Sequence, residues 1–259
     1  MFGKPVVLNV DGLDRQRGKW NALGQTALHF CEWLSVYTPT RVVTDAAPIQ
    51  DYYQTRYRKQ STLIGYGSDL PPGEHKLDGF NLQPGRYVLY VSRLEPENNP
   101  DLVLHAWRKV RSDWPLVMLG DNRYDNGYVD RLQQMADDRV MFPGAIYGDG
   151  YWALQKNAGV FVFACEVGGV HPALIEAMAA ENAVLYLDSP ENNHTAGDAA
   201  IRFSKSTDDL ASKLQALLDD PTARQQWAAR AVSRAHALYR WDDVAKQYEK
   251  LFEEVLRRR

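Results

Sequence analysis

The stretch GVFVFACEVGGVHPALIEAMAAE, residues 159–181, joins an apolar run to a helical pattern through a pair of glycines. Residues 159–165 are almost wholly apolar, as in a strand that is buried on both faces of a sheet. Residues 171–181 are rich in alanine and have larger apolar residues at helical spacing. A strand that leads directly into a helix is typical of a βαβ unit, so this stretch predicts an α/β fold with a parallel sheet.

The same alternation of apolar runs and helical patterns continues in both directions. After residue 86, we expect strands at 87–93, 115–121, 139–144, 159–165 and 183–188, helices at 99–111, 128–136, 151–158 and 171–181, and a helical end from residue 206. Before it, we expect strands at 5–10, 41–45 and 61–67 and helices at 21–37 and 47–57. The later series is a complete doubly wound, Rossmann-like domain, whereas the earlier one has the size of a partial domain of the same kind.

The domain boundaries follow from a segment without apolar periodicity. Residues 68–86 are rich in proline and glycine, which predicts an interdomain linker. We therefore divide the chain into a partial N-terminal domain at 1–67, the linker at 68–86, a complete C-terminal domain at 87–240 and a final helix at 241–259. We expect this final helix to cross back to the N-terminal part.

The composition is that of an ordinary globular protein, with 259 residues of which 45% are hydrophobic and 24% are charged. The formal net charge of −3 argues against a broad cationic surface for nucleic acid. Cys31 and Cys165 lie far apart and outside any Cys-x-x-Cys motif, which is typical of a reduced, cytoplasmic protein. No apolar run is long enough to span a bilayer, and no Cys/His cluster with metal-ligand spacing is present.

The glycine pair, Gly168 and Gly169, marks the first candidate site. Ligands of open parallel sheets bind beyond the carboxyl ends of the strands, and the pair lies between such an end and the next helix. Free N–H groups at a helix start favour an anion, and glycines let a phosphate reach the backbone. Farther along the helix, the Glu176 carboxylate can accept hydrogen bonds from ribose hydroxyls. The alternative is a glycine-rich turn followed by a solvated glutamate.

Arg93 marks a second candidate site, at the carboxyl end of the expected strand 87–93. A guanidinium at this position can clamp a phosphate through two hydrogen bonds. The alternative is an exposed arginine that pairs with Glu95 or Glu97. Because Arg93 and the glycine pair lie on the same edge of one sheet, together they favour an anion site more than either does alone.

Longer stretches of the chain resemble a known family. SRLEPENNPDLVLHAW (92–107) and GGVHPALIEAMAAENAVLYLDSPENNHTAGDAAIRF (168–203) resemble the C-terminal half of retaining glycosyltransferases of family four, which have the two-domain GT-B fold. VLNVDGLDRQRGKW (7–20) and AAPIQDYYQTRY (46–57) are similar to the later part of the N-terminal domain in a bacterial, rhamnosyltransferase-like subgroup of polysaccharide-building transferases.

The resemblance implies that the C-terminal domain binds a nucleotide-diphosphate sugar. Arg93 would contact the diphosphate opposite the amides of the glycine turn, and Glu176 would accept the ribose hydroxyls. The residues that the resemblance implies for the donor site are Arg93, Gly168, Gly169, Val170, His171 and Glu176. No Cys/His cluster or suitably placed Asp-x-Asp in the sequence suggests a metal ion, and we expect no other cofactor.

The chain departs from the family pattern in three places. Many members have a lysine five residues after the arginine, where this chain has Asn98. Many also have two glutamates with seven residues between them, and the first of these would stand at Gly168, whereas the nearest carboxylate here is Glu166. We keep Asn98 and Glu166 as candidate donor-binding residues. Members also have a longer stretch of chain before the region that matches 7–20, so the resemblance implies a shortened N-terminal domain.

The loop at 9–20 and the helix at 21–37 supply the candidates for acceptor and partner contacts. Asp11, Arg17 and Lys19 follow a strand and would face the interdomain cleft of a GT-B protein; the alternative is a charged surface loop. The helix has an apolar stripe of Phe30, Trp33, Leu34 and Tyr37. Such a stripe is core, a peripheral membrane contact, or a surface that joins a second copy or a partner chain.

These observations predict a metal-independent glycosyltransferase. It would move a sugar from a nucleotide-diphosphate sugar to a saccharide or lipid-linked acceptor, with retention of anomeric configuration. We expect it in the cytoplasm, with the inner face of the membrane as the alternative location. The alternative function is a non-catalytic protein that binds a nucleotide sugar and needs a partner chain to complete its fold.

Overall fold

The larger of two parallel sheets decides the architecture of the protein. The computed structural model describes residues 4–13, 20–122 and 126–257. Within these ranges the larger sheet has six strands in the spatial order β6-β5-β4-β7-β8-β9. Counted along the chain this is the order 3-2-1-4-5-6 of a Rossmann domain, so the predicted fold class is confirmed. The strands are β4 (Val88–Val91), β5 (Leu116–Leu119), β6 (Val140–Gly144), β7 (Val160–Phe163), β8 (Ala183–Leu187) and β9 (Ile201–Phe203).

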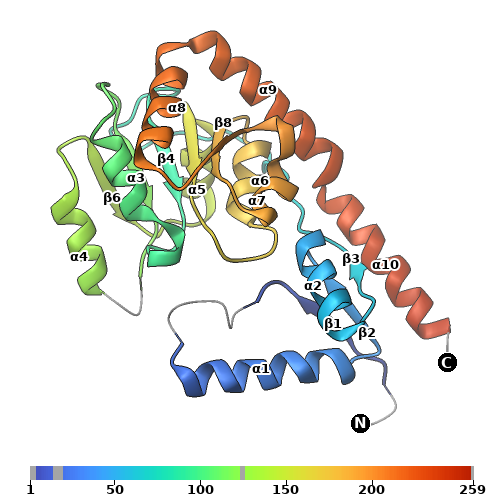
Figure 1. The fold of residues 1–259 in the computed structure, drawn as a ribbon. Helices are drawn as coiled ribbons and strands as arrows, with labels where there is room; N and C mark the ends of the chain where they lie inside the picture. Colours follow the sequence, from blue (N-terminus) through green and yellow to red (C-terminus); the bar gives the residue numbers. More distant parts are fainter. Residues whose placement is uncertain (1–3, 14–19, 123–125, 258–259) are drawn as a thin grey trace.

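Helices cover both faces of the larger sheet (Figure 1). Because side chains alternate along a strand, Val88 and Tyr90 contribute to one core cluster, and Tyr87 and Leu89 contribute to the other. The helices of the first cluster are α3 (Pro100–Trp107), α4 (Asn126–Met135) and α8 (Thr207–Asp219). Those of the second are α5 (Gly148–Lys156), α6 (Pro172–Ala179) and α9 (Pro221–Leu238).

The stretch between β8 and α8 differs from the sequence expectation, which assigns no element to it. The structure has a seven-residue helix, α7 (Pro190–Ala196), and the edge strand β9. A short 3₁₀ turn, η3 (Gly197–Ala199), separates them, and another, η2 (Pro96–Asn98), precedes α3. α7 is polar and β9 has three residues, so neither gives a readable apolar period.

The linker lies against the C-terminal domain. No helix or strand is assigned between Thr62–Leu63, the two residues of β3, and the start of β4. Leu77, Phe80 and Leu82 pack on the second core cluster, and the Asn157 side-chain amide donates to the His75 carbonyl at 2.6 Å. The expected strand at 61–67 is therefore shorter than predicted, because the chain leaves the small sheet early.

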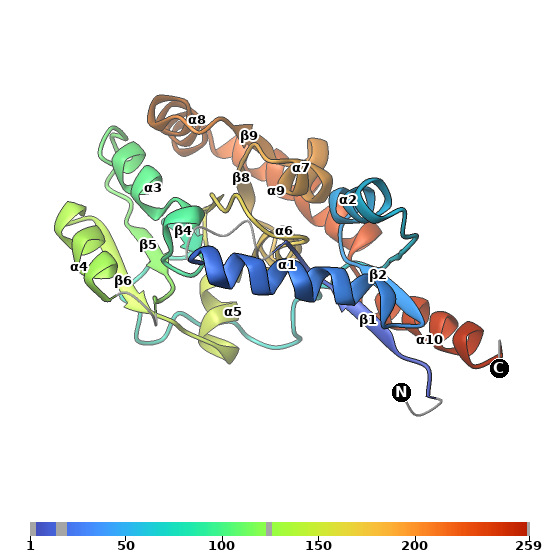
Figure 2. The same ribbon diagram turned by 60° about the horizontal axis from the view of Figure 1, so that its bottom comes forward.

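The smaller sheet is parallel in the order β1-β2-β3, with β1 (Val7–Val10) and β2 (Arg41–Thr44) followed by β3. α2 (Ala47–Tyr57) follows β2, and α10 (Trp241–Arg257) returns from the C-terminal domain to run beside this sheet (Figures 1 and 2). Val244, Leu251 and Val255 of α10 pack with Val43 and Ile64. The last helix thus supplies part of the core of the N-terminal domain.

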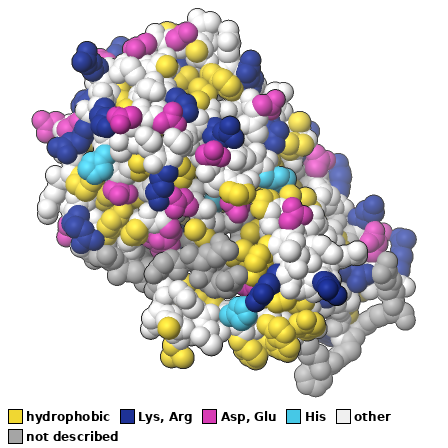
Figure 3. All heavy atoms as spheres, in the orientation of Figure 1, with side chains coloured by type: hydrophobic (Ala, Val, Ile, Leu, Met, Phe, Trp, Pro, Cys, Tyr) yellow, Lys and Arg dark blue, Asp and Glu magenta, His cyan; other side chains and the backbone are white. Residues whose placement is uncertain are grey.

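Helix α1 (Ala22–Tyr37) has one packed side and one exposed side. On the packed side Val36 is buried, and Glu32 accepts hydrogen bonds from the hydroxyls of Tyr52 and Tyr57 of α2, each at 2.6 Å. On the exposed side Phe30, Trp33 and Tyr37 are 58%, 45% and 61% exposed, whereas Leu34 of the predicted stripe is half-buried. Figure 3 shows hydrophobic side chains gathered along the lower edge of the molecule, where Figure 1 places α1.

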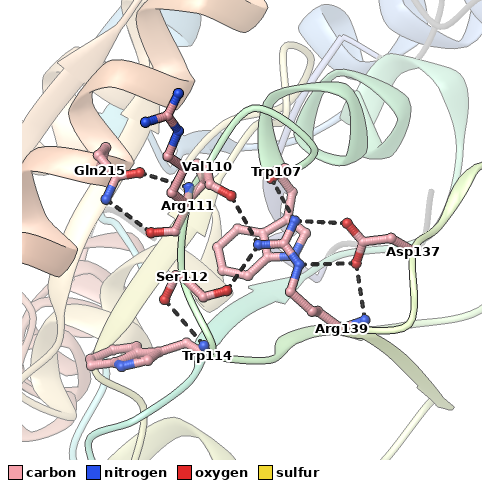
Figure 4. A network of polar contacts seen from close by, with 8 residues as sticks. All are labelled: Trp107, Val110, Arg111, Ser112, Trp114, Asp137, Arg139 and Gln215. Atoms are coloured by element: carbon pink, nitrogen blue, oxygen red, sulfur yellow. Dashed lines mark hydrogen bonds and ion pairs between the residues drawn. The ribbon is translucent and has the colours of Figure 1, made fainter.

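The amino ends of β5 and β6 are tied together by Arg139 (Figure 4). Its guanidinium pairs with Asp137 at 2.7 Å and donates to the carbonyls of Trp107, Val110 and Ser112. It also stacks over the Trp107 ring. These contacts lie at the amino end of the sheet, and the candidate site lies at the opposite, carboxyl end. None of the helices in the described ranges has both the length and the apolar character needed to cross a bilayer.

Candidate functional site

The strand order creates a crevice between β4 and β7, where successive connections leave the sheet in opposite directions. A cavity of about 850 Å³ lies there, at the carboxyl ends of the strands. This volume is typical of pockets that enclose a small molecule or a cofactor. The polar residues on its walls include Ser92, Arg93, Glu95, Asn98, Asp121, Tyr151, His171 and Glu176.

Arg93 follows β4 and lines the cavity, as the sequence predicts. Its side chain is 51% exposed, and its Nη1 atom lies 3.5 Å from the Glu95 carboxylate. The two interpretations of this residue therefore hold together, because the arginine pairs with Glu95 and also faces the cavity. The Glu95 carboxylate is itself only 7% exposed, so Arg93 compensates a buried charge while about half of its own side chain stays exposed.

Asn98 shapes the loop that carries Arg93. Its side-chain amide donates to the Arg93 carbonyl at 2.7 Å, and its own carbonyl accepts from the Tyr90 hydroxyl at 2.7 Å. The next residue, Asn99, donates from its side chain to the Ala164 carbonyl at 2.8 Å. These buried asparagines join the end of β4 to the end of β7, a role for Asn99 that no motif in the sequence predicts.

Glu176 projects from α6 to the other side of the cavity. The hydroxyl of Tyr151, on α5, donates to its Oε2 atom, and the Gln155 side-chain amide donates to the same hydroxyl at 2.9 Å. Burial raises the pKa of Glu176, and the hydrogen bond from Tyr151 opposes this shift. Tyr151 is a site residue that sequence reasoning misses, because a lone aromatic on a helix gives no motif.

The glycine turn is crowded by side chains of the protein itself. A Cβ atom at Gly168 would lie 2.3 Å from the His171 ring, and one at Gly169 would lie 2.2 Å from a carboxylate oxygen of Asp45. The His171 ring also contacts Phe163, at 4.9 Å between ring centroids. A Cβ atom at either glycine would therefore displace a neighbouring side chain of the protein itself.

The turn has two sides with different surroundings. Val167 and His171 line the cavity, and α6 begins there with its first N–H groups. The Val170 N–H instead donates to the Oδ2 atom of Asp45 at 3.0 Å, across the domain boundary. Of the amides predicted to face a diphosphate, that of Val170 is thus engaged by an anion of the same chain.

Glu166 lies outside the set of cavity-lining residues. It pairs with Lys205 at 2.5 Å, and its backbone N–H donates to the Glu97 carbonyl at 3.1 Å. This carboxylate, predicted to bind the donor, therefore pairs with a lysine just after β9 and does not line the cavity.

The acceptor-side candidates begin where β1 ends. Asp11 is exposed and lies close enough to Asp45 to raise the pKa of that carboxyl further, beyond the larger effect of burial. Gly12 approaches Gly168, with 3.7 Å between an added Cβ at Gly12 and the Gly168 Cα. The end of β1 therefore faces the glycine turn. Arg17 and Lys19 lie outside the described residues.

The described side chains that line the cavity include more acidic than basic groups, so Arg93 matters most for binding an anion there. Among the described residues that line it, Arg93 is the one arginine or lysine, and Glu95, Asp121 and Glu176 are acidic. An anion in the cavity would therefore depend on Arg93 and on the N-terminus of α6. The described residues contain no group of three His, Cys, Asp or Glu side chains placed to hold a metal ion.

A solved structure has the same fold. The Anabaena protein HepE, solved with UDP and glucose, superimposes with a TM-score of 0.82 at 15% sequence identity, over 97% of this chain and 72% of that one. At this level of identity the likeness concerns the fold.

Sequence comparisons identify the relatives of the chain. The phosphatidyl-myo-inositol mannosyltransferase of Mycolicibacterium smegmatis is 29% identical over 191 residues, 69% of this chain and 47% of the relative. The N-acetylgalactosamine-N,N'-diacetylbacillosaminyl-diphospho-undecaprenol 4-alpha-N-acetylgalactosaminyltransferase of Campylobacter jejuni is 24% identical over 170 residues, 64% of this chain and 46% of the relative. The chain thus spans less than half the length of these two proteins. Residues 78–234 match the model of the family described as glycosyl transferases group 1, so the chain belongs to that family.

Proposed function

We propose that this protein transfers a sugar from a nucleotide-diphosphate sugar to a saccharide or lipid-linked acceptor, with retention of anomeric configuration. The observation that carries the proposal is the convergence of Arg93 and Glu176, from segments far apart in sequence, on one cavity at the switch point of the sheet. The likeness to HepE, which was solved with UDP and glucose, supports a nucleotide sugar as the ligand.

In this proposal the diphosphate lies between Arg93 and the start of α6. The His171 end of the turn supplies helix N–H groups and the positive end of the helix dipole, and Arg93 supplies the balancing charge. Glu176 accepts hydrogen bonds from the ribose hydroxyls. When the bond between the sugar and the diphosphate breaks, negative charge grows on the leaving group, and the same contacts stabilise it. No protein nucleophile is assigned to the retaining step.

The acceptor is proposed to approach from the N-terminal domain. Asp11 lies near the glycine turn on that side, and Arg17 and Lys19 belong to the same loop in sequence. The names of the two related transferases include a phosphatidyl-myo-inositol and a diphospho-undecaprenol, which supports a lipid-linked acceptor. The exposed stripe of α1 offers a surface for a membrane or for a partner chain.

The test is binding and turnover with a panel of nucleotide sugars. We expect one of them to bind by calorimetry, in the presence of excess chelator as well as in its absence, and to be hydrolysed slowly without acceptor. Glu176→Gln should weaken a ribonucleoside diphosphate and leave its 2′,3′-dideoxy analogue almost unchanged. Binding without hydrolysis or transfer would support the non-catalytic alternative, and no binding by any member of the panel would contradict the proposal.

A further inference from the structure

Asp45 is a buried carboxylate that the proposed function does not use. It follows β2 in the N-terminal domain and is 2% exposed. Its Oδ2 atom accepts the hydrogen bond from the Val170 N–H at 3.0 Å, and its Oδ1 atom is buried without a hydrogen-bond partner among the described residues. A side chain of one domain thus holds a backbone donor of the glycine turn in the other.

The fit between Asp45 and the turn depends on glycine. A Cβ atom at Gly169 would lie 2.2 Å from Oδ1 and 2.6 Å from Cγ of Asp45, well inside van der Waals contact. The backbone at Gly169 is outside the left-handed region, so the local conformation alone would accept alanine. What excludes a side chain at this position is therefore the carboxylate of Asp45.

Apolar packing surrounds the hydrogen bond on both sides of the domain boundary. The Val170 side chain is 4% exposed and belongs to one core cluster with Leu13, Ala46 and Ile49 of the N-terminal domain and Ile175 of α6. Within the described residues, the turn is therefore embedded in the other domain at Val170 and open to the cavity one residue later, at His171.

The titratable side chains that face Asp45 in the described residues do not compensate its charge, which is stabilised instead by backbone N–H groups, that of Val170 foremost. Asp11 after β1, Tyr66 after β3 and Tyr248 on α10 are acidic or phenolic, and His171 lies beyond Gly168 with its ring against that glycine. Burial, with a smaller contribution from Asp11, raises the pKa of Asp45 to about 6. Burial of this carboxylate costs free energy, so its place at the turn depends on the contacts that surround it. This is the behaviour of a residue that positions its neighbours.

We propose that Asp45 is a positioning residue for the donor site: through Val170 it fixes the glycine turn, and with it the start of α6, in the orientation that meets the donor diphosphate. The inference rests on the proposed function of that turn. Because the contact joins residues of different domains, it also makes the donor site depend on the docking of the N-terminal domain.

A double-mutant cycle between Asp45 and Gly169 tests this role, read by calorimetry with the nucleotide sugar that the wild-type protein binds. Asp45→Ala should weaken the affinity by about tenfold or more, whereas Asp45→Asn, which keeps an oxygen acceptor for Val170, should retain it within about threefold. Gly169→Ala should weaken the affinity about tenfold in the wild-type background. In the Asp45→Ala background, where the colliding carboxylate is gone, the same substitution should weaken it only slightly further. Asp51→Asn, on the exposed side of α2, is the matched control and should change nothing.

Other outcomes would overturn the inference. Wild-type affinity in Asp45→Ala would remove the positioning role. An equal cost of Gly169→Ala in both backgrounds would mean that the ligand, and not Asp45, requires the glycine. Thermal unfolding of each variant shows whether it is folded, and Asp45→Ser replaces Asp45→Ala in the cycle if the latter is not. Failure of the wild-type protein to bind any nucleotide sugar would contradict the proposed function itself, which is a different result from a change confined to the variants.

Discussion

The hydroxyl of Tyr151 donates its hydrogen to the Oε2 atom of Glu176. The Gln155 amide donates to the oxygen of the same hydroxyl, so Tyr151 has to direct its own hydrogen at Glu176. Burial, together with the neighbouring Glu176 charge, raises the pKa of Tyr151, and the tyrosine therefore remains a donor at neutral pH. The hydrogen bond from Tyr151 of α5 thus fixes one oxygen of Glu176 and with it the orientation of the carboxylate at the edge of the cavity.

Replacement of this hydroxyl tests whether Glu176 needs a fixed orientation. Tyr151→Phe should weaken binding of a ribonucleoside diphosphate by about 1 kcal/mol, the usual net contribution of one hydrogen bond, and should barely affect the 2′,3′-dideoxy analogue. Calorimetry with the two ligands measures both values. Tyr147→Phe is the control, since Tyr147 lines the same cavity but is 74% exposed. Equal losses for both ligands would show that Tyr151 acts through something other than the ribose contact.

The buried Asp45 predicts a pH dependence of stability. Its pKa is raised from 3.8 to about 6 in the folded protein, so the folded state binds the proton more tightly than the unfolded state does. Its contribution is therefore full below about pH 4 and is lost as the pH rises through 6.

The measurement is the free energy of unfolding of the wild-type protein and of Asp45→Asn between pH 4 and 7. Relative to the variant, the wild-type protein should lose up to about 3 kcal/mol over this range, the value of a pKa difference of about two. His171 and Asp11 are present in both proteins, so the difference between the two curves isolates the contribution of Asp45. If the free energies of unfolding of the two proteins changed in parallel with pH, the pKa of Asp45 would be the same in the folded and unfolded states, and the prediction would be wrong.

The exposed stripe of α1 predicts association. Phe30, Trp33 and Tyr37 form a continuous aromatic surface, with ring centroids 6.0 Å and 5.0 Å apart along the row. Surfaces of this kind usually mark interaction sites, and a two-fold dimer is the commonest form of self-association. We expect a concentration-dependent homodimer in sedimentation, and Trp33→Glu should shift it to monomer without changing thermal unfolding of the larger domain. A monomer at all concentrations that also fails to bind anionic vesicles would contradict a docking role for this stripe.

The sequence pattern predicts the larger sheet well because its strands are apolar on both faces and are separated by helix-length spacers. It also predicts that Arg93 and the glycine pair lie on one edge, because ligands bind at the carboxyl ends of parallel strands. In the structure Arg93 lines the cavity, as do Val167 and His171 on either side of the glycine turn. Local pattern and strand direction are sufficient for these conclusions.

The remaining features depend on contacts between segments that are distant in sequence. Asp45 and Val170 are 125 positions apart, and the partnership of Tyr151 with Glu176 spans 25 positions. Glu166 forms an ion pair with Lys205, and no sequence motif connects these two residues. A single sequence carries no signal for such pairs, because each depends on how two elements pack and not on the period of either.

The most direct measurement is a calorimetric titration of the wild-type protein, Arg93→Ala and Arg86→Ala with a nucleotide-diphosphate sugar. Arg86 and Arg93 flank β4 at opposite ends, each is 51% exposed, and each pairs with one carboxylate, so the two variants lose the same charge. Arg93→Ala should weaken binding by about 2–4 kcal/mol, because it removes the charge-assisted contact to the diphosphate, whereas Arg86→Ala should bind like the wild-type protein. Unchanged affinity in Arg93→Ala, or an equal loss in both variants, would contradict the assignment of this cavity as the donor site.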